Sequence, residues 1–449
     1  MGGGRQVRVF FCPVPCPKAN IDREKTAWRV ASDGFEIAEE AESADVVVVF
    51  TCGFIDDAKQ EAIDDILAYA AMKREGKIKS LVVAGCLAEK YGPELARQMP
   101  EVDCFVGTGE IDRLSQVIRE VSAGGNAGRI RRSGDRDRSR FSEQVERIRA
   151  GRPWTRAVMI CDGCDNACTY CAIPEMRGRL RSRPEEEILR EAKALVEQGA
   201  GEIVLAGQDT ASYGRDLVGS TLGSLIARLA RESGAHWIRL AYANPENITV
   251  DVAQAIRDHA NVCHYIDMPV QHASPKILAA MGRKKPPEEM RRLVDRVRET
   301  VPDIALRTSV IVGFPGETEK DFRALLDFLE RVRFDMVGAF RFSAQPGTPA
   351  SRLPDKVPAR VAEDRLVEVT CLAHEIARTK TEDLVGKTLE VLVESRKGGS
   401  ARGRSAYDMA EVDRVIAIRN CAARPGEFIK VRITGYVGPY DVQGTSLEG

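Results

Sequence analysis

The feature that most constrains the fold of this 449-residue chain is a regular alternation of short apolar runs and amphipathic stretches between residues 153 and 342. The apolar runs have the length of buried β-strands, and they cover residues 156–161, 202–206, 237–242, 263–268, 305–312 and 336–342. Helical patterns separate them, as in residues 184–198, 222–232 and 319–331. Six strand–helix units are too few for a closed eight-stranded barrel, so we predict a partial (β/α)6 barrel with its functional groups at the carboxyl ends of the strands.

Three closely spaced cysteines follow the first of these predicted strands, at the edge where function is expected. Cys164, Cys168 and Cys171 have the spacing CxxxCxxC within one loop. Thiolates this close together can bind three irons of a cubane cluster and leave the fourth iron open to a ligand. A structural zinc site with Cys161 as the fourth ligand, or a redox pair of thiols, are the alternative interpretations.

A second set of cysteines lies in residues 1–125. Apolar runs at 7–11, 44–50 and 81–84, with an amphipathic stretch at 57–73, predict an α/β layer around a small parallel sheet. A cysteine follows each run, and these are Cys16, Cys52 and Cys86. Because parallel strands bring their carboxyl ends to one edge, we expect the three thiols to converge on one crevice. Buried apolar thiols are the alternative, and we assign Cys12 and Cys104 to that structural kind.

The two remaining segments differ in composition. Residues 126–152 carry nine Arg and four acidic residues and hardly any apolar ones, which predicts an exposed linker or a solvated helix, with a binding patch as the alternative. Residues 383–449 contain strand patterns between Gly-rich turns, at 389–394, 415–418, 428–434 and 436–442, which predict a small β-barrel. Ten Lys and Arg face nine acidic residues there, so net charge does not favour RNA binding over substrate docking or a purely structural role.

Whole-chain composition is that of a large soluble enzyme. Lys and Arg number 66 and Asp and Glu 67, so overall charge directs the chain toward neither nucleic acid nor a membrane. No apolar run approaches the roughly 18 residues of a membrane span, and the amino terminus lacks the apolar core of a signal peptide. We therefore expect a cytoplasmic protein with no membrane partner, whose 12 cysteines are reduced and available to metals.

Two further loops lie at the same predicted edge, and this position favours cofactor binding over the alternative of ordinary turns. The second strand of the series ends in Gly207, Gln208 and Asp209, where polar groups can reach an amino group of a ligand. The fifth ends in residues 313–317, where glycines permit close approach of the backbone, and the candidate residues are Gly313, Gly316 and Glu317.

With Tyr170 directly before its last cysteine, the CxxxCxxC loop resembles that of the radical S-adenosylmethionine (SAM) enzymes. Nearly the whole chain then resembles the methylthiotransferases, and among them those that modify a ribosomal protein aspartate. The resemblance runs through CPKANIDRE at Cys16, TCGFIDDAK at Cys52, GCLAEKYG at Cys86, DGCDNACTYCAIPEMRGRLRSRP at Cys164, QDTASYG at Gln208, MPVQHASPKIL at Met268 and VGFPGETEKDF at Val312. The pair His272-Ala273 and the run Gln208-Asp-Thr favour the protein-modifying branch over the tRNA-modifying one.

The resemblance implies an α/β fold in three parts, with an N-terminal α/β sandwich domain (1–125), a linker (126–152), a radical SAM core (153–382) and a TRAM-like barrel (383–449). It implies a radical-generating 4Fe-4S cluster on Cys164, Cys168 and Cys171, and a second 4Fe-4S cluster, which carries the sulfur, on Cys16, Cys52 and Cys86. One SAM would methylate that sulfur and another would supply a 5′-deoxyadenosyl radical, giving 3-methylthioaspartate. The implied partners are a small-subunit ribosomal protein (the one numbered twelve) or the assembled ribosome, and an electron donor such as flavodoxin or ferredoxin.

Two other functions stay open at this point. A tRNA adenosine methylthiotransferase would share every cluster ligand, and a non-catalytic iron–sulfur or zinc protein that binds RNA would never cleave SAM. The sequence also departs from the family pattern without losing a ligand, at Pro15, Ala19, Phe50 and Gln443, where Gly, Asn, Asn and a nearby Trp are usual.

Overall fold

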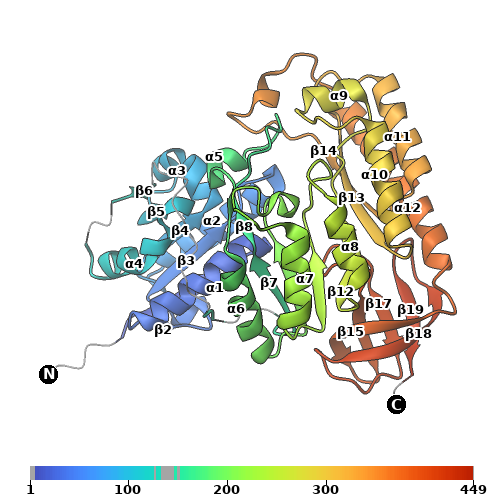
Figure 1. Cartoon of the computed structure of the whole chain (residues 1–449). Helices are drawn as coiled ribbons and strands as arrows, with labels where there is room; N and C mark the ends of the chain where they lie inside the picture. Colours follow the sequence, from blue (N-terminus) through green and yellow to red (C-terminus); the bar gives the residue numbers. More distant parts are fainter. Residues whose placement is uncertain (1–5, 126–127, 133–145, 149–151, 448–449) are drawn as a thin grey trace.

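The computed structural model describes residues 6–125, 128–132, 146–148 and 152–447, which form two parallel sheets and a closed β-barrel (Figure 1). The predicted fold class is confirmed, from the N-terminal α/β layer through the open (β/α)6 barrel to the small β-barrel. Most of the predicted linker, 126–152, lies outside the described residues. Among the helices of the described ranges, none has the length and apolar character needed to cross a membrane.

The N-terminal sheet has six parallel strands in the order β2-β1-β3-β4-β5-β6. Their bounds are β1 Arg8–Cys12, β2 Glu36–Ile37, β3 Val46–Thr51, β4 Ser80–Gly85, β5 Cys104–Val106 and β6 Ile130–Arg131. Strands β3 and β4 consist wholly of buried residues, because a parallel sheet covered on both faces is apolar throughout. The three predicted strands are confirmed, whereas β2, β5 and β6 escape the sequence pattern because they are only two or three residues long.

Helices cover both faces of this sheet. Their bounds are α1 Pro17–Ser32, α2 Asp56–Arg74, α3 Cys86–Gln98 and α4 Leu114–Ser122, with 3-10 turns η1 Ala41–Ser43 and η2 Thr108–Arg113. Alternate residues of β3 enter different cores: Val47 packs toward α2 and α3, and Val48 packs toward α1 and α4. These helices cover the two faces of the sheet and leave its carboxyl edge, where the cysteines follow the strands, uncovered by them.

The central sheet also has six parallel strands, in the order β14-β13-β12-β11-β10-β7. Their bounds are β7 Thr155–Met159, β10 Glu202–Ala206, β11 Trp237–Leu240, β12 Val262–Asp267, β13 Ala305–Val312 and β14 Met336–Arg341. All six predicted strands are confirmed to within two residues at each end. Strands β7 and β14 stand at opposite ends of the order, so the barrel is open, as predicted from the number of units.

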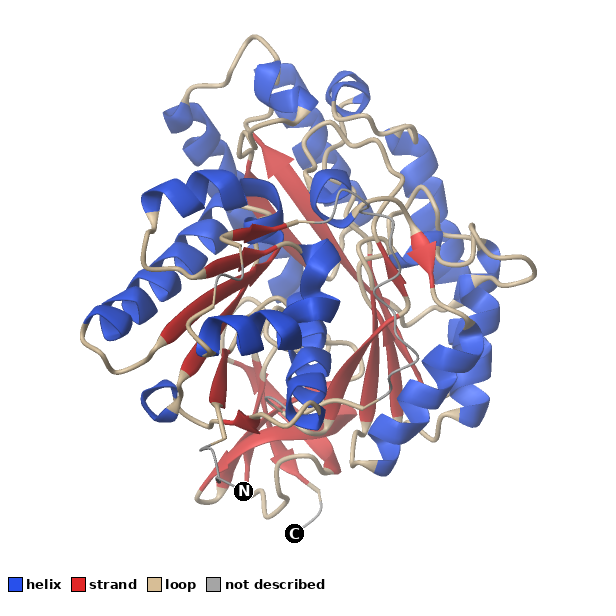
Figure 2. Ribbon diagram, turned by 90° about the vertical axis from the view of Figure 1, so that its left-hand side faces the viewer, coloured by secondary structure: helices blue, strands red, loops and turns tan. Residues whose placement is uncertain are grey.

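Helices line the outer, convex side of the central sheet (Figure 2). Alternate strand residues such as Leu205 and Leu240 pack beneath them in the largest apolar core of the described residues. The helices and short elements of this region are α5 Ile173–Arg177, α6 Glu185–Glu197, α7 Leu222–Glu232, α8 Val250–Asp258, α9 Pro275–Ala280, α10 Pro287–Thr300, α11 Glu319–Val332, α12 Ala359–Glu382, η3 Thr210–Ser212, η4 Pro349–Arg352, and the two-residue pair β8 Cys161–Asp162 and β9 Arg181–Ser182.

The C-terminal strands close into a barrel in the order β15-β16-β17-β19-β18. Their bounds are β15 Thr388–Lys397, β16 Ser400–Ser405, β17 Ile416–Arg419, β18 Phe428–Tyr436 and β19 Val442–Ser446. The predicted strand at 436–442 is wrong, because residues 437–441 form the turn between β18 and β19. Strand β16 was missed because its sequence, SARGRS, contains a single apolar side chain longer than glycine.

This barrel sits on the amino ends of the central strands. Trp237, the first residue of β11, stacks edge-on against Phe428 of β18 at a ring-centroid distance of 4.8 Å. Leu392 and Met409 join the same apolar cluster, which includes Tyr265 from the concave face of the sheet. The barrel therefore covers the open half-barrel from the side opposite the cysteine loop.

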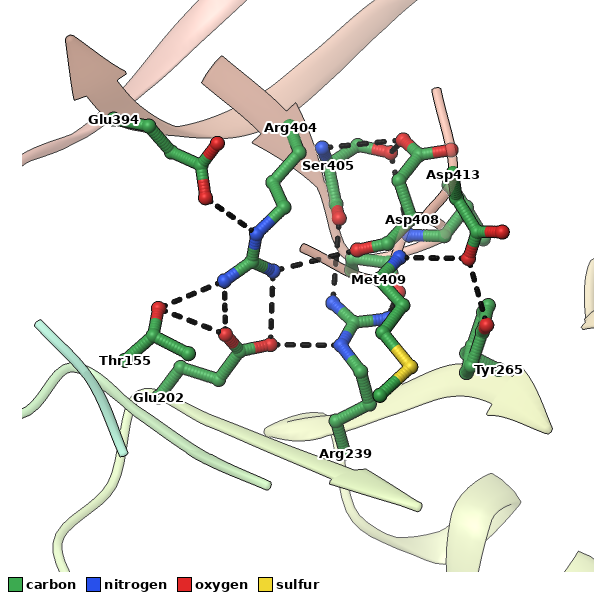
Figure 3. Close-up of polar contacts among 12 residues, drawn as sticks. Thr155, Glu202, Arg239, Tyr265, Glu394, Arg404, Ser405, Asp408, Met409 and Asp413 are labelled. Carbon is green, nitrogen blue, oxygen red and sulfur yellow. Dashed lines mark hydrogen bonds and ion pairs between the residues drawn. The ribbon is translucent and has the colours of Figure 1, made fainter. Parts of the chain in front are cut away.

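A buried ionic lock reinforces this contact (Figure 3). Glu202, the fully buried first residue of β10, accepts hydrogen bonds from Arg239 Nε at 2.7 Å and from the guanidinium of Arg404 in the barrel. Arg404 Nε also donates to Glu394 at 2.9 Å, and Arg404 Nη2 donates to Thr155 at 2.8 Å. Burial alone would raise the pKa of Glu202. The positive charges of Arg404 and Arg239 outweigh this effect and lower the pKa to about 2.

Candidate functional site

The CxxxCxxC loop leaves the first strand of the central sheet and ends at α5. Its three thiols, on Cys164, Cys168 and Cys171, are partly exposed. Thr169 pins the loop, because its N–H donates to Met281 O at 3.0 Å and its hydroxyl donates to Ala280 O at 2.7 Å. The loop is thus fixed at the carboxyl edge of the sheet, where the sequence analysis expected it.

A web of amide and carboxylate groups fixes the start of this loop. Asn166 Nδ2 lies 3.3 Å from Cys164 Sγ and donates to Asp209 Oδ2 at 2.7 Å. Asn247 Nδ2 donates to the same oxygen at 2.6 Å and to Asn166 Oδ1 at 3.2 Å. Asp209 is buried and accepts further bonds from Ser212 Oγ and two backbone amides. Asp209 therefore connects the cysteine loop to the carboxyl ends of β10 and β11.

The thiols of Cys164 and Cys171 lie in surroundings that favour the protonated form in the absence of metal. Burial raises the pKa of Cys164 to about 11 and that of Cys171 to about 12. Burial and the charge of Cys168 also raise the pKa of the Tyr170 hydroxyl. Arg283 Nη1 lies 4.0 Å from Cys168 Sγ and supplies positive charge there. Metal binding to these thiols releases protons, since the thiolate is the ligand.

The three cysteines of the N-terminal sheet also come together. Cys16 is the N-cap of α1, Cys52 follows β3, and Cys86 begins α3, so each stands at the carboxyl end of a neighbouring strand. The thiols of Cys16 and Cys52 are hydrogen-bonded, and Cys86 acts electrostatically on Cys52. The hydrogen bond from Cys52 and the charge of Lys18 hold the pKa of Cys16 well below its ordinary value.

Close backbone packing brings these loops into contact. Gly85 has φ +108°, and a Cβ there would stand 2.8 Å from Thr51 O. A Cβ on Gly53 would stand 3.2 Å from the backbone of Leu87. Glycine at both positions therefore lets the loops after β3 and β4 approach each other beside Cys52.

A buried arginine from the central region reaches this second triplet. Arg177, the last residue of α5, is ion-paired with Asp22 at 2.9 Å and Asp162 at 3.5 Å, and it also hydrogen-bonds Cys86. Burial lowers the pKa of Arg177, but Asp22, Cys86 and Asp162 outweigh that effect and keep it charged. Sequence reasoning missed Arg177, although it follows Cys171 by only six residues.

The two triplets are neighbours in space. Cys86 packs against Ala172 and Met176, and Ala172 directly follows Cys171. Lys90 of α3 lies between the regions, ion-paired with Glu175 at 3.0 Å. The structure therefore brings the loops that carry the two triplets together where α3 contacts α5.

The two loops predicted to bind cofactor lie at the same edge. Gly207 is buried, and a Cβ there would stand 2.7 Å from Cys161 Sγ; Gln208 is half-buried, with Oε1 lacking a hydrogen-bond partner within the described residues. Glu317 accepts from Phe314 N at 3.0 Å and from Arg365 at 3.1 Å, and burial raises its pKa.

The glycines of the second loop have left-handed backbones. Gly313 has φ +74° and Gly316 has φ +80°. A Cβ on Gly313 would stand 2.6 Å from Ala362 Cβ, whereas Gly316 faces open space. The nearby His272 is buried, with its Nε2 3.9 Å from Glu317, and burial lowers its pKa to about 4. The predicted SAM contacts of this loop stay predictions.

Three further cysteines, Cys161, Cys12 and Cys104, lie in the surroundings of buried structural thiols. Cys161 is buried in β8, and its thiol donates to Asp209 O at 3.5 Å, so a backbone carbonyl already satisfies it. Across the described ranges, no three Cys, His, Asp or Glu side chains are close enough to share a single metal ion. A cubane cluster instead distributes its thiolates over separate irons. Burial raises the pKa of Cys12 and of Cys104 to about 11.

The departures from the family pattern leave the thiols in place. Pro15 is exposed, and Ala19 is buried with its N–H bonded to Cys16. Phe50 packs against Phe11 on the α1 face of the sheet, at a ring-centroid distance of 6.3 Å. Gln443 accepts from Arg419 at 3.2 Å in the barrel, remote in the fold from the cysteines.

Family comparisons agree with this arrangement. The Radical SAM superfamily matches residues 158–329, the uncharacterized protein family UPF0004 matches 8–107, and the TRAM domain matches 385–446. With a cysteine loop at the carboxyl edge of an open six-stranded barrel, these matches define a radical SAM enzyme. Its cofactors accordingly include a 4Fe-4S cluster and SAM.

Relatives of known function identify the family to which the chain belongs within the radical SAM enzymes. The chain is 42% identical over 441 residues to the ribosomal protein uS12 methylthiotransferase RimO of Geobacter sulfurreducens, covering 97% of this chain and 98% of that protein. It is 43% identical to the protein of the same name from Symbiobacterium thermophilum, covering 99% and 92%. The chain belongs to this family of radical SAM methylthiotransferases and is a transferase.

A solved structure shows the same fold at low identity. The radical SAM methyltransferase TsrM of Kitasatospora setae superposes with a TM-score of 0.60 at 15% identity, covering 88% of this chain and 79% of that one. At this identity the likeness concerns the fold alone.

Proposed function

We propose that this enzyme inserts a methylthio group at the β-carbon of an aspartate in ribosomal protein uS12. The observation that carries the proposal is the junction of α3 and α5, where Cys86 of one triplet packs against Ala172, next to Cys171 of the other. A radical source and a sulfur source must both reach one substrate carbon, and this juxtaposition meets that requirement. The names of the relatives from Geobacter and Symbiobacterium support the choice of substrate.

Two 4Fe-4S clusters fit the donor sets of this junction. Cys164, Cys168 and Cys171 would hold the SAM-binding cluster, and Cys16, Cys52 and Cys86 would hold the second. When bound, these groups supply the hydrogen-abstracting radical and the methylthio sulfur. Such chemistry is required because an unactivated C–H bond has no acidic proton for a general base to remove.

The residues around the clusters orient their ligands. Asn166 and Asn247 act as positioning residues through Asp209, since they fix the start of the CxxxCxxC loop. Arg177 orients Cys86 and neutralises charge beside it. Partners of this kind typically matter 10- to 100-fold for a metal site, about 1.4 to 2.7 kcal/mol.

The proposal also covers the SAM contacts, the segment boundaries and the electron donor that the sequence predicts. Contacts to SAM are assigned to Tyr170 and to the two rim loops, through Gly207, Gln208, Asp209, Gly313, Gly316 and Glu317. The chain divides at residues 125, 152 and 382 into the four segments expected from its sequence. The proposal includes an electron donor such as flavodoxin or ferredoxin, and a ribosomal substrate implies a reaction in the cytoplasm.

Anaerobic incubation tests the function directly. Reconstituted protein is mixed with SAM, dithionite, sulfide and whole ribosomes, and ribosomal proteins and tRNA nucleosides are then analysed by mass spectrometry. A methylthio mass shift on one aspartate of uS12 is expected, and a Cys164→Ala variant should give none. Methylthioadenosine formed in tRNA by the wild type and not by Cys164→Ala would overturn the substrate assignment.

Binding to tRNA provides an independent check. A protein that neutralises six phosphates loses about a thousandfold in affinity between 50 and 200 mM salt. The barrel segment, with ten basic and nine acidic residues, is expected to give weak tRNA binding with a flat salt dependence. A steep slope with tight binding would contradict the proposal.

A further inference from the structure

A lysine lies between the two carboxyl edges that carry the cysteines. Lys18 is the second residue of α1, two positions after Cys16. Its Nζ stands 3.8 Å from the ring centroid of Tyr242, which follows β11 of the central sheet. Cys16, Cys52 and the guanidinium group of Arg177 are its other electrostatic neighbours. The ammonium group therefore lies between the second cysteine triplet and the carboxyl end of β11 in the central sheet.

The charge of Lys18 lacks an acidic partner. In the parts of the chain that the structure describes, no ion pair or hydrogen bond joins Lys18 Nζ to a carboxylate. The cations around it differ in this respect: Arg177 is paired with Asp22 and Asp162, and Lys90 is paired with Glu175. A half-buried ammonium on an aromatic face, without an acid, is suited to receive an anionic ligand.

Tyr242 is held in a conformation that is uncommon for its residue type. Its φ is +58°, in the left-handed region that non-glycine residues seldom adopt. Its carbonyl accepts a hydrogen bond from Thr210 N at 3.0 Å, which ties this turn to the loop after β10. Strain of this kind persists where the surrounding structure holds a residue in place, and here it presents the ring to Lys18.

We propose that Lys18 Nζ binds the side-chain carboxylate of the substrate aspartate and so holds its β-carbon between the two triplets. This inference rests on the proposed function and adds the residue that recognises the substrate. The β-carbon is bonded directly to that carboxylate, so a contact with the carboxylate also positions the reacting carbon. Adenine has no anionic group at the corresponding place, and Lys18 would thereby favour a protein over tRNA.

The competing role for Lys18 is charge compensation of the Cys16 and Cys52 thiolates alone. The two roles predict different measurements. If Lys18 only compensates charge, its replacement lowers the iron content and changes the affinity for both kinds of ligand alike. If Lys18 recognises the substrate, its replacement lowers the affinity only for ligands that carry the carboxylate. The Lys18→Arg variant keeps the positive charge in both cases, and Lys18→Met removes it while keeping much of the side-chain volume.

The experiment uses anaerobically reconstituted holoenzyme and two fluorescent peptides that copy the uS12 target loop, one with the aspartate and one with asparagine. Anisotropy should show that wild type binds the aspartate peptide at least tenfold more tightly than the asparagine peptide. Lys18→Met should bind both equally with unchanged iron and sulfide content, and Lys18→Arg should keep part of the preference. Lys193→Met, an exposed lysine of α6, is the matched control and should behave as wild type.

Each other outcome has a defined meaning. Absence of a preference in wild type, or a preference retained by Lys18→Met, would overturn the inference. Loss of half the iron in Lys18→Met with the preference intact would assign the lysine to charge compensation instead. A preference in wild type that Lys18→Met loses, without any methylthio product from either peptide, would leave the inference standing and remove the proposed function.

Discussion

Both edges of the central sheet bury ionisable side chains, but the groups compared at the two edges differ in their state of charge. At the amino edge, Glu202 is enclosed by Arg239 and Arg404, so its charge is compensated within the chain. At the carboxyl edge, the thiols of Cys164 and Cys171 are left protonated by their surroundings and become ligands only when a metal replaces the proton. The amino edge is therefore built for stability and the carboxyl edge for ligands, as is general for barrels of this type.

The largest expected effect comes from the carboxyl edge. Replacing Cys164, Cys168 and Cys171 together by alanine should abolish formation of 5′-deoxyadenosine and leave roughly half the iron, because one of two clusters remains. Iron analysis and chromatography of the SAM products measure both. The unfolding midpoint of the metal-free protein should stay unchanged.

The converse triple variant sharpens this test. Alanine at Cys16, Cys52 and Cys86 should retain SAM cleavage and lose methylthiolation, again with roughly half the iron. If either triple variant lost all iron, the two sites would not be independent. Zinc at full occupancy in the wild type would contradict the assignment for both.

The amino edge should show the opposite response. Glu202→Gln leaves two buried guanidinium groups short of a counter-charge, which typically costs about 3–5 kcal/mol. Urea unfolding followed by tryptophan fluorescence, to which Trp237 and Trp154 of the barrel contact contribute, measures the loss. SAM cleavage at low temperature should be unaffected. Glu186→Gln, which removes an exposed partner of Arg228, is the control and should cost about 0–1 kcal/mol.

Acid should weaken the same lock. The folded pKa of Glu202, about 2, lies below its ordinary value of 4.5, so its contribution to stability is complete above pH 4.5 and disappears as the pH falls through 2. The difference corresponds to about 3 kcal/mol. Unfolding free energies measured from pH 5 to pH 2 should fall less in Glu202→Gln than in wild type. Equal slopes for the two proteins would show that folding leaves the pKa of Glu202 unchanged, which would contradict the stabilising role of its ion pairs.

The smallest expected effect returns to the carboxyl edge. Asn166→Ala removes the link between Cys164 and Asp209 without removing a ligand, and SAM cleavage should fall about 10- to 100-fold. Asn261→Ala is the matched control, since its amide Nδ2 donates to the carbonyls of Ala230 and Ala235 on the amino side, away from the cysteine loop. A similar loss of activity in both variants would mean that general loosening, rather than the loop, is responsible.

Much of the fold could be predicted because it depends on local periodicity. The strands of the central sheet are apolar runs bounded by helical patterns, and both properties are visible within a short window. The failures have the same origin. Strand β16 contains Ser, Arg and Gly, and it is a strand only because β15 and β17 pair with it on either side. The turn at 437–441 was mistaken for a strand because of Val437 and Tyr440, although the pair Gly438-Pro439 between them favours a turn.

The sequence by itself determined the two cysteine triplets, since the CxxxCxxC spacing is local and parallel strands align their carboxyl ends wherever they pair. Only the tertiary structure decided what surrounds those thiols. Arg177 lies against Cys86 because α5 packs on α3, and Lys18 meets Tyr242 because one sheet stands beside the other. Such contacts join residues far apart in the chain, and they depend on how whole layers pack, which no local pattern encodes.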